Sequence, residues 1–226
     1  MSWVLDNLDL IAKLTLVHLR QSAIAIVLSF LIALPLGWLA WRFRVLRSGI
    51  ITVVGLLYTI PSLALLMLLP TLLGISPLSE LNLIIALILY GVALMVRAVA
   101  DGLDAIDPDV RLAATAMGYG PARRFARVDF PLAGPVVLAG LRVTAVSTIA
   151  LATVGILIGI ENLGYLFTNG YQRRIIEEIF SGIVAVVVIA LVIDLLLVLA
   201  GRLLMPWSRT PTRRAATRRV EAEALA

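Results

Sequence analysis

The densest group of ionisable residues lies between positions 101 and 135, in an interval that separates two strongly apolar blocks. Four aspartates precede Arg111, and three arginines, Arg123, Arg124 and Arg127, follow within five positions. A covalent or acid–base enzyme needs polar side chains that converge on one point, and neither this interval nor the rest of the sequence offers such a set. The chain is therefore expected not to be an enzyme.

The scarcity of cysteine, histidine and lysine argues against several kinds of binding site. The chain has no cysteine and one histidine, His18, which argues against a zinc or di-iron site. A phosphate-binding loop needs a lysine after a glycine-rich turn, and the only lysine, Lys13, has no glycine before it. The sequence predicts no cofactor in this chain, so ATP-driven work would require a separate ATPase that binds ATP and Mg.

Two charged residues, Arg142 and Asp194, interrupt apolar blocks. At the rise of an α-helix they would lie about 10 Å and about 15 Å into their membrane spans. A charge at that depth is costly unless it is paired or hydrated. We expect the two side chains to face the protein interior and to pair, either as a structural ion pair or as a gate in a transport path.

Composition identifies the elements that must position these residues. Of the 226 residues, 61% are hydrophobic and 15% are charged, against roughly 45–50% apolar residues in soluble domains. The sequence predicts an all-α polytopic membrane protein with about five transmembrane helices. Their expected bounds are 21–41, 50–73, 81–100, 135–159 and 180–204.

The segments outside the spans have separate expected roles. Residues 1–20 read as an amphipathic interfacial helix rather than a signal peptide, although a sixth span remains open. Residues 101–134 form a loop between the third and fourth spans. Residues 205–226 form a basic tail that we expect to be mobile.

The loop carries the signals of a first short helix. Asp107 suits the N-cap, Pro108 the first helical position, and Asp109 the first turn, where the helix dipole favours a negative charge. An Ala-rich helix is predicted over residues 110–117. Gly118 can then reverse the chain, because glycine adopts positive φ without a Cβ penalty.

A second short helix is predicted to follow directly. Gly120 contributes to the reversal, Pro121 begins the helix, and Pro131 and Pro135 end it. Two helices at a sharp angle with small side chains would form a protrusion that fits a socket on a partner protein. An ordinary surface loop that joins two spans explains the composition equally well.

The second span contains a proline, Pro61, which frees a backbone carbonyl within the bilayer. Thr59 and Ser62 are placed to satisfy the local backbone. A broken helix of this kind often lines a transport path, and Tyr58, Pro61 and Ser62 are the candidate path residues. A kink that simply packs against its neighbours is the alternative.

The distribution of positive charge predicts the orientation. One side holds 13 arginines in the loop after the first span, the loop at 101–134 and the tail; the other side holds Lys13, Arg20, Arg173 and Arg174. The arginine-rich side is expected to be cytoplasmic, with the N-terminus outside and the C-terminus inside.

The 101–134 loop resembles the cytoplasmic signature loop of the permease subunits of binding-protein-dependent ABC importers. That signature reads Glu-Ala-Ala, three residues, Gly, nine residues, Ile, one residue, Leu-Pro. The matching positions are Leu112, Ala113, Ala114, Gly118, Val128, Phe130 and Pro131. Leu112, Val128 and Phe130 depart from the usual residues, and the first departure removes any polar contact that the family's Glu makes.

The resemblance extends over residues 14–204 and is closest to the osmoprotectant branch of these permeases. It includes residues 59–75, 90–118 and 130–155, and the segment 158–170 is similar to that branch's G-A-G-G-L-G, with Ile160, Glu161 and Asn162 replacing small residues. Methionine permeases share much of this pattern. Import of methionine or another small solute is therefore one alternative, and an ATP-independent channel or membrane scaffold is another.

The resemblance implies a type I importer permease in the inner membrane that carries glycine betaine, carnitine or choline by alternating access. Its implied partners are P-loop ATPase subunits, an extracytoplasmic substrate-binding protein and a second permease, identical or different. The implied ATPase-coupling residues are Leu112, Ala113, Ala114, Gly118, Gly120, Arg123, Arg124, Arg127 and Pro131.

Overall fold

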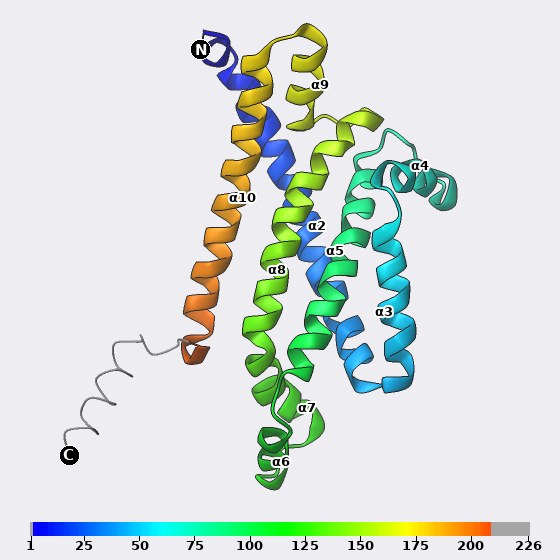
Figure 1. Ribbon diagram of the computed structural model, residues 1–226, viewed down its shortest axis with the longest axis vertical. Coiled ribbons are helices and arrows are strands. Elements are labelled where there is room, and N and C mark those ends of the chain that lie inside the picture. The colour runs from blue at the N-terminus through cyan, green and yellow to red at the C-terminus, as the bar shows by residue number, and fades with distance from the viewer. Residues whose placement is uncertain (1, 209–226) are drawn as a thin grey trace, which may run out of the picture.

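The computed structural model describes residues 2–208, and most of the predicted basic tail lies outside them. This part of the chain is helical and contains no strand, which confirms the predicted all-α class (Figure 1). The elements are α1 (Ser2–Asp6), α2 (Leu8–Arg42), α3 (Arg44–Thr59), α4 (Ser62–Leu73), α5 (Glu80–Asp104), α6 (Pro108–Ala116), α7 (Pro121–Arg124), a π-helical turn η1 (Phe125–Asp129), α8 (Phe130–Ala152), a 3₁₀ turn η2 (Thr153–Ile158), α9 (Gly164–Arg173), α10 (Ile176–Leu204) and a 3₁₀ turn η3 (Pro206–Ser208).

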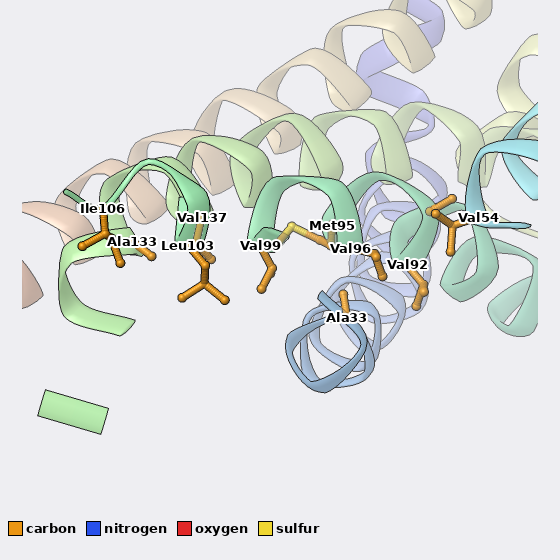
Figure 2. Packing of buried hydrophobic residues seen from close by; sticks show 11 residues of the cluster. Ala33, Val54, Val92, Met95, Val96, Val99, Leu103, Ile106, Ala133 and Val137 are labelled. Atoms are coloured by element: carbon orange, nitrogen blue, oxygen red, sulfur yellow. The ribbon is translucent and has the colours of Figure 1, made fainter. Parts of the chain in front are cut away.

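The long helices form a bundle with α5 at its centre. Helix α5 packs on α2, α3, α4 and α8, while α10 packs on α8 and α9 at the other side (Figure 1). The core between them is built from small and β-branched side chains, among them Ala33, Val96, Val99 and Val137 (Figure 2). Side chains of this size let helices approach closely, as is typical of membrane bundles.

One close approach depends on a glycine. A Cβ at Gly37 would lie 2.6 Å from the Cβ of Val99, so α2 contacts α5 through bare backbone at this point. The contact lies two residues after Pro35, which stands inside α2 without ending it. Close packing therefore fixes the register of these two helices.

Within residues 2–208, four helices or helix runs are long and apolar enough to cross a membrane: α2, α5, the run from Pro121 to Ile158, and α10. The pair α3 and α4 passes the same test together but is bent by 108° at its break. The break lies at Ile60 and Pro61, where the sequence predicted an interrupted span. Counting this pair as one span gives five.

Two helix boundaries differ from the predicted ones. Helix α2 runs without a break through residues 20 and 21, so the expected interfacial helix and the first span are one helix. The polar residues that suggested a membrane surface, such as His18 and Gln21, are instead buried against protein. Their amphipathic pattern reflects helix packing, because a face buried on another helix and a face on the lipid surface produce the same period.

Pro131 and Pro135 do not end the second loop helix. The helical path continues from Pro121 to Ile158, with Pro131 in the first turn of α8 and Pro135 inside it. A proline removes its own N–H from the hydrogen-bond ladder and its ring crowds the carbonyl four residues earlier. For Pro131 that carbonyl belongs to Arg127, which lies in the wider π-helical turn before α8. The segment between α5 and α8 is residues 105–129, shorter than the predicted loop over 101–134.

Candidate coupling surface and transport path

Helices α6 and α7 form a hairpin, residues 107–124, that projects from one end of the bundle (Figure 1). It begins as the sequence predicted: Asp107 Oδ1 accepts a hydrogen bond of 2.9 Å from the Asp109 N–H, and Pro108 occupies the first turn. Helix α6 thus begins at the local sequence signals that predicted it.

The reversal between α6 and α7 depends on Gly118 alone. Its φ is +83°, in the left-handed region, whereas Gly120 has φ −65° and lies in extended backbone. An added Cβ at Gly118 would meet no atom within 4 Å, so the backbone angle and not space selects glycine. The expectation that Gly120 shares the reversal is wrong.

The tip of the hairpin presents an apolar surface. Leu112 is 73% exposed and Met117, which the sequence analysis did not single out, is 71% exposed; Ala113 beside them is also exposed. Ala114 is only 1% exposed, so its side chain is closed to any partner. Leu112, Ala113 and Gly118 are exposed, so their docking role stays a prediction, and Met117 shares the same exposed surface.

A buried carboxylate ties the hairpin to the bundle. Asp129 is 1% exposed; its Oδ1 accepts from Nε of Arg111 at 3.2 Å and its Oδ2 from Nε of Arg124 at 3.4 Å. Arg111 also donates to the carbonyl of Leu103 at the end of α5. These contacts join α5, α6 and α7 in one ionic network.

The remaining predicted coupling residues have different surroundings. Arg123 lies with its guanidinium carbon 4.9 Å from the ring centroid of Tyr119, Arg127 is exposed, and Pro131 is half-buried. Arg124 is held inward by Asp129 and Thr115. Asp129 was not among the predicted site residues, although it is the one acid in a basic segment, Arg123 to Asp129.

The break between α3 and α4 brings together the predicted path residues. The phenol of Tyr90 in α5 donates to the carbonyl of Ile60, which the following Pro61 leaves outside a helical ladder. Tyr58 packs edge-on against Tyr90 with ring centroids 5.9 Å apart, and 49% of Tyr58 is exposed. Tyr90 was missed because the sequence offered no sign that α5 passes this break.

Ser62 lies beside this aromatic pair and lines a cavity of about 10 Å³ together with Tyr90. A space of that size holds about one water molecule. It cannot hold an organic solute.

The predicted pairing of Arg142 with Asp194 is confirmed. Nε and Nη2 of Arg142 donate to the two carboxylate oxygens of Asp194 at 2.7 Å and 2.8 Å, which is a two-point contact between α8 and α10. The pair is not enclosed by this chain, since the side chains are 41% and 28% exposed. Within residues 2–208, no group of three or more His, Cys, Asp or Glu is arranged to hold a metal ion.

A second polar network lies at the opposite end of the bundle from the hairpin. The side-chain amide of Asn162 donates to the carbonyl of Ala152 at 2.7 Å and to Gln21 Oε1 at 3.2 Å, while His18 Nε2 lies 3.0 Å from the carbonyl of Ile149. All three side chains are at most 1% exposed. They fasten α2 to the turn that leads into α9.

Comparison with known proteins places these features in a wider group. The family described as binding-protein-dependent transport system inner membrane component matches residues 17–210. The choline transport system permease protein OpuBB of Bacillus subtilis is 35% identical over 84% of this chain and 86% of its own length. The osmoprotectant import permease protein OsmW of Salmonella typhimurium is 32% identical over 86% of this chain and 92% of its own.

The fold has a solved counterpart. A structure of the MetNI methionine ABC transporter in inward-facing conformations contains a chain that superposes with a TM-score of 0.73, covering 89% of this chain and 98% of that one. The two sequences are 22% identical, so the likeness concerns the arrangement of helices.

Proposed function

The chain belongs to the family of binding-protein-dependent transport system inner membrane components, and we propose that it forms the transport path of an ATP-driven importer for a small quaternary ammonium osmoprotectant. Glycine betaine, carnitine and choline are the substrates of this class. The similarity to OpuBB and OsmW over most of each chain supports this choice of substrate.

The observation that carries the proposal is the α6–α7 hairpin. It ends in an exposed apolar tip with a glycine turn and is joined through Asp129 to the central helix α5. Such a rigid lever can transmit a movement from a partner to the bundle. In this proposal Leu112, Ala113, Met117 and Gly118 contact an ATPase subunit, with Arg123 and Arg127 at the rim.

The arrangement of charges supports an orientation in the membrane. The hairpin and the arginines that follow α2 lie at the same end of the bundle (Figure 1), and positive residues favour the cytoplasmic side. We place that end in the cytoplasm and the N-terminus outside. The substrate-binding protein then delivers its cargo at the end formed by α4, η2 and α9.

The transport path is proposed to lie along the α3–α4 break, between this chain and a second permease. The exposed ring of Tyr58 offers its π face to a quaternary ammonium group. The bend at Pro61 gives the span two segments that can move separately. Closure of the ATPases would rock α5 through the hairpin and expose the path alternately to each side.

Substrate accumulation in cells tests this function. The chain, with its ATPase and binding protein, is expressed in bacteria that lack their own betaine uptake, and radiolabelled glycine betaine is supplied. We expect accumulation with the unaltered chain and loss with Gly118→Asp, which places a charge in the apolar tip while leaving insertion intact. Normal accumulation and normal ATPase co-purification with Gly118→Asp would contradict the hairpin assignment.

A further inference from the structure

A cationic cleft lies beside the hairpin, between the α2–α3 turn, the end of α5 and α6. It has a volume of about 1010 Å³. Its charged lining comprises Arg42, Arg44, Arg47, Arg111, Arg124 and Asp104. Five guanidinium groups thus share the cleft with one carboxylate.

The charges in the cleft are only partly matched. Arg47 pairs with Asp104 and lies 3.8 Å from Asp101, while Arg111 and Arg124 share Asp129 outside the cleft. Arg42 and Arg44 are exposed and form no ion pair within residues 2–208. Two unpaired positive charges at the mouth of a concave surface attract an anion.

The cleft continues into apolar surface. A neighbouring hollow of about 370 Å³ shares Trp41, Arg42 and Arg124 with the cleft. A third hollow, of about 510 Å³, shares Trp38 and Phe125 with the second. Its other walls are Leu34, Pro35, Ala126 and Phe130. The shared walls arrange the three hollows in a row from cationic to apolar.

The position of this row matches a membrane surface. Trp38 and Trp41 end the apolar part of α2, and Arg42 follows at once. Tryptophan is enriched where hydrocarbon meets the headgroup layer, and arginine lies just outside it. The apolar hollow therefore lies at the depth of acyl chains and the cationic cleft at the depth of lipid phosphates.

We propose that this row is a binding site for an anionic phospholipid. Its phosphate contacts Arg42 and Arg44 in the cleft, and an acyl chain lies along Pro35, Trp38 and Ala126. A free phosphate would leave the apolar hollow empty. An acidic segment of an ATPase would reach the cleft but would leave the third, apolar hollow empty. The site stands independently of the transported solute.

A bound lipid at this place would bridge two moving parts. Arg42 and Arg44 belong to the α2–α3 turn, whereas Arg124 and Ala126 belong to the run from α7 into α8. Direct contacts already join these parts, since the rings of Trp38 and Phe125 lie edge-on with centroids 6.2 Å apart and the Arg111 guanidinium carbon lies 4.7 Å from the Trp41 ring centroid. The lipid would reinforce this junction.

Native mass spectrometry of the purified transport complex tests the site. Phosphatidylglycerol and phosphatidylcholine with identical acyl chains are titrated separately. The unaltered complex should bind phosphatidylglycerol more tightly, and the double variant Arg42→Gln, Arg44→Gln should lose roughly tenfold or more of that affinity with phosphatidylcholine binding unchanged. Arg127→Gln removes an exposed arginine outside the row and should change neither.

The apolar half has its own variant. Ala126→Phe fills the third hollow and should weaken phosphatidylglycerol binding without affecting Arg42 or Arg44. Equal losses from Arg127→Gln and the double variant, no loss from Ala126→Phe, or full displacement by inorganic phosphate at lipid-matched concentration would each overturn the proposal. Loss of the ATPase from the double variant with unchanged lipid selectivity would assign the cleft to the ATPase and overturn it as well.

Discussion

At the scale of single residues, Asp129 does more for the hairpin than any residue at its tip. Its carboxylate is 1% exposed and accepts from both Arg111 and Arg124, whose own side chains are 18% and 27% exposed. Removing one member of such a buried network leaves the others without a counter-charge, which costs more than the intact network contributes. The lever that joins α5 to the hairpin thus depends on one carboxylate.

Asp129→Asn should lower the stability of the folded chain by on the order of 1–3 kcal/mol, because the amide cannot balance two guanidinium groups. Thermal unfolding of the purified protein in detergent measures the change. Asp104→Asn is the matched control, since that carboxylate is 44% exposed and its ion pair with Arg47 is screened by water. Equal shifts in the two variants would show that Asp129 does not hold the network.

The Arg142–Asp194 pair separates a structural role from a gating role. We expect the double variant Arg142→Gln, Asp194→Asn to lose less stability than the sum of the losses in the two single variants. Each single change leaves one charge unpaired in a membrane helix, whereas the double change leaves none. Thermal unfolding of the unaltered chain, the two single variants and the double variant gives the coupling free energy between the two residues.

Transport by the same double variant then decides the role of the pair. Substrate uptake at the level of the unaltered chain would identify a structural pair. A folded double variant that no longer transports would assign the pair to the transport path.

At the scale of elements, the turn between α6 and α7 and the contact between α2 and α5 each depend on a glycine for a different reason. Gly118 needs its left-handed backbone in open space, whereas Gly37 has ordinary helical backbone but no room for a side chain. The first sets the shape of a surface and the second sets the distance between two spans.

Gly118→Val should weaken co-purification of the ATPase several-fold, because a β-branched residue disfavours positive φ and reshapes the tip. Gly120→Val is the control: it also lies in open space but has an extended backbone that valine adopts freely. Similar ATPase recovery with both variants would argue that the turn geometry is irrelevant to coupling.

Gly37→Ala should destabilise the bundle by roughly 1–3 kcal/mol through overpacking against Val99. Gly55→Ala in α3 meets nothing within 4 Å and should be neutral or slightly stabilising. Thermal unfolding distinguishes the two, and an unchanged melting temperature for Gly37→Ala would mean that α2 and α5 can separate at no cost.

At the scale of the whole molecule, the sequence predicted the helical class, the broken second span, the two-helix loop and the Arg142–Asp194 pair. Each of these follows from a local signal or from the cost of charge in lipid. The continuity of α2 could not be predicted, because the polar faces of His18 and Gln21 look the same whether water or protein covers them. The burial of Ala114 and the role of Asp129 depend on how α5, α6 and α7 meet, which no local pattern records.

The same limit applies to the substrate path. Near Ser62 and Tyr90 the described residues form a cavity of about the size of one water molecule, and Tyr58 and Pro61 are exposed. In the proposed function a second permease completes the path, and transport is a property of the assembled complex.

Uptake into proteoliposomes shows whether the chain imports an osmoprotectant with energy from ATP. The chain, its ATPase and its binding protein are reconstituted, with ATP or ADP enclosed on the ATPase side, and radiolabelled glycine betaine, choline and methionine are supplied in parallel. We expect ATP-dependent uptake of glycine betaine or choline and no uptake of methionine. Methionine uptake alone, or betaine uptake that is equal with ADP, would contradict it.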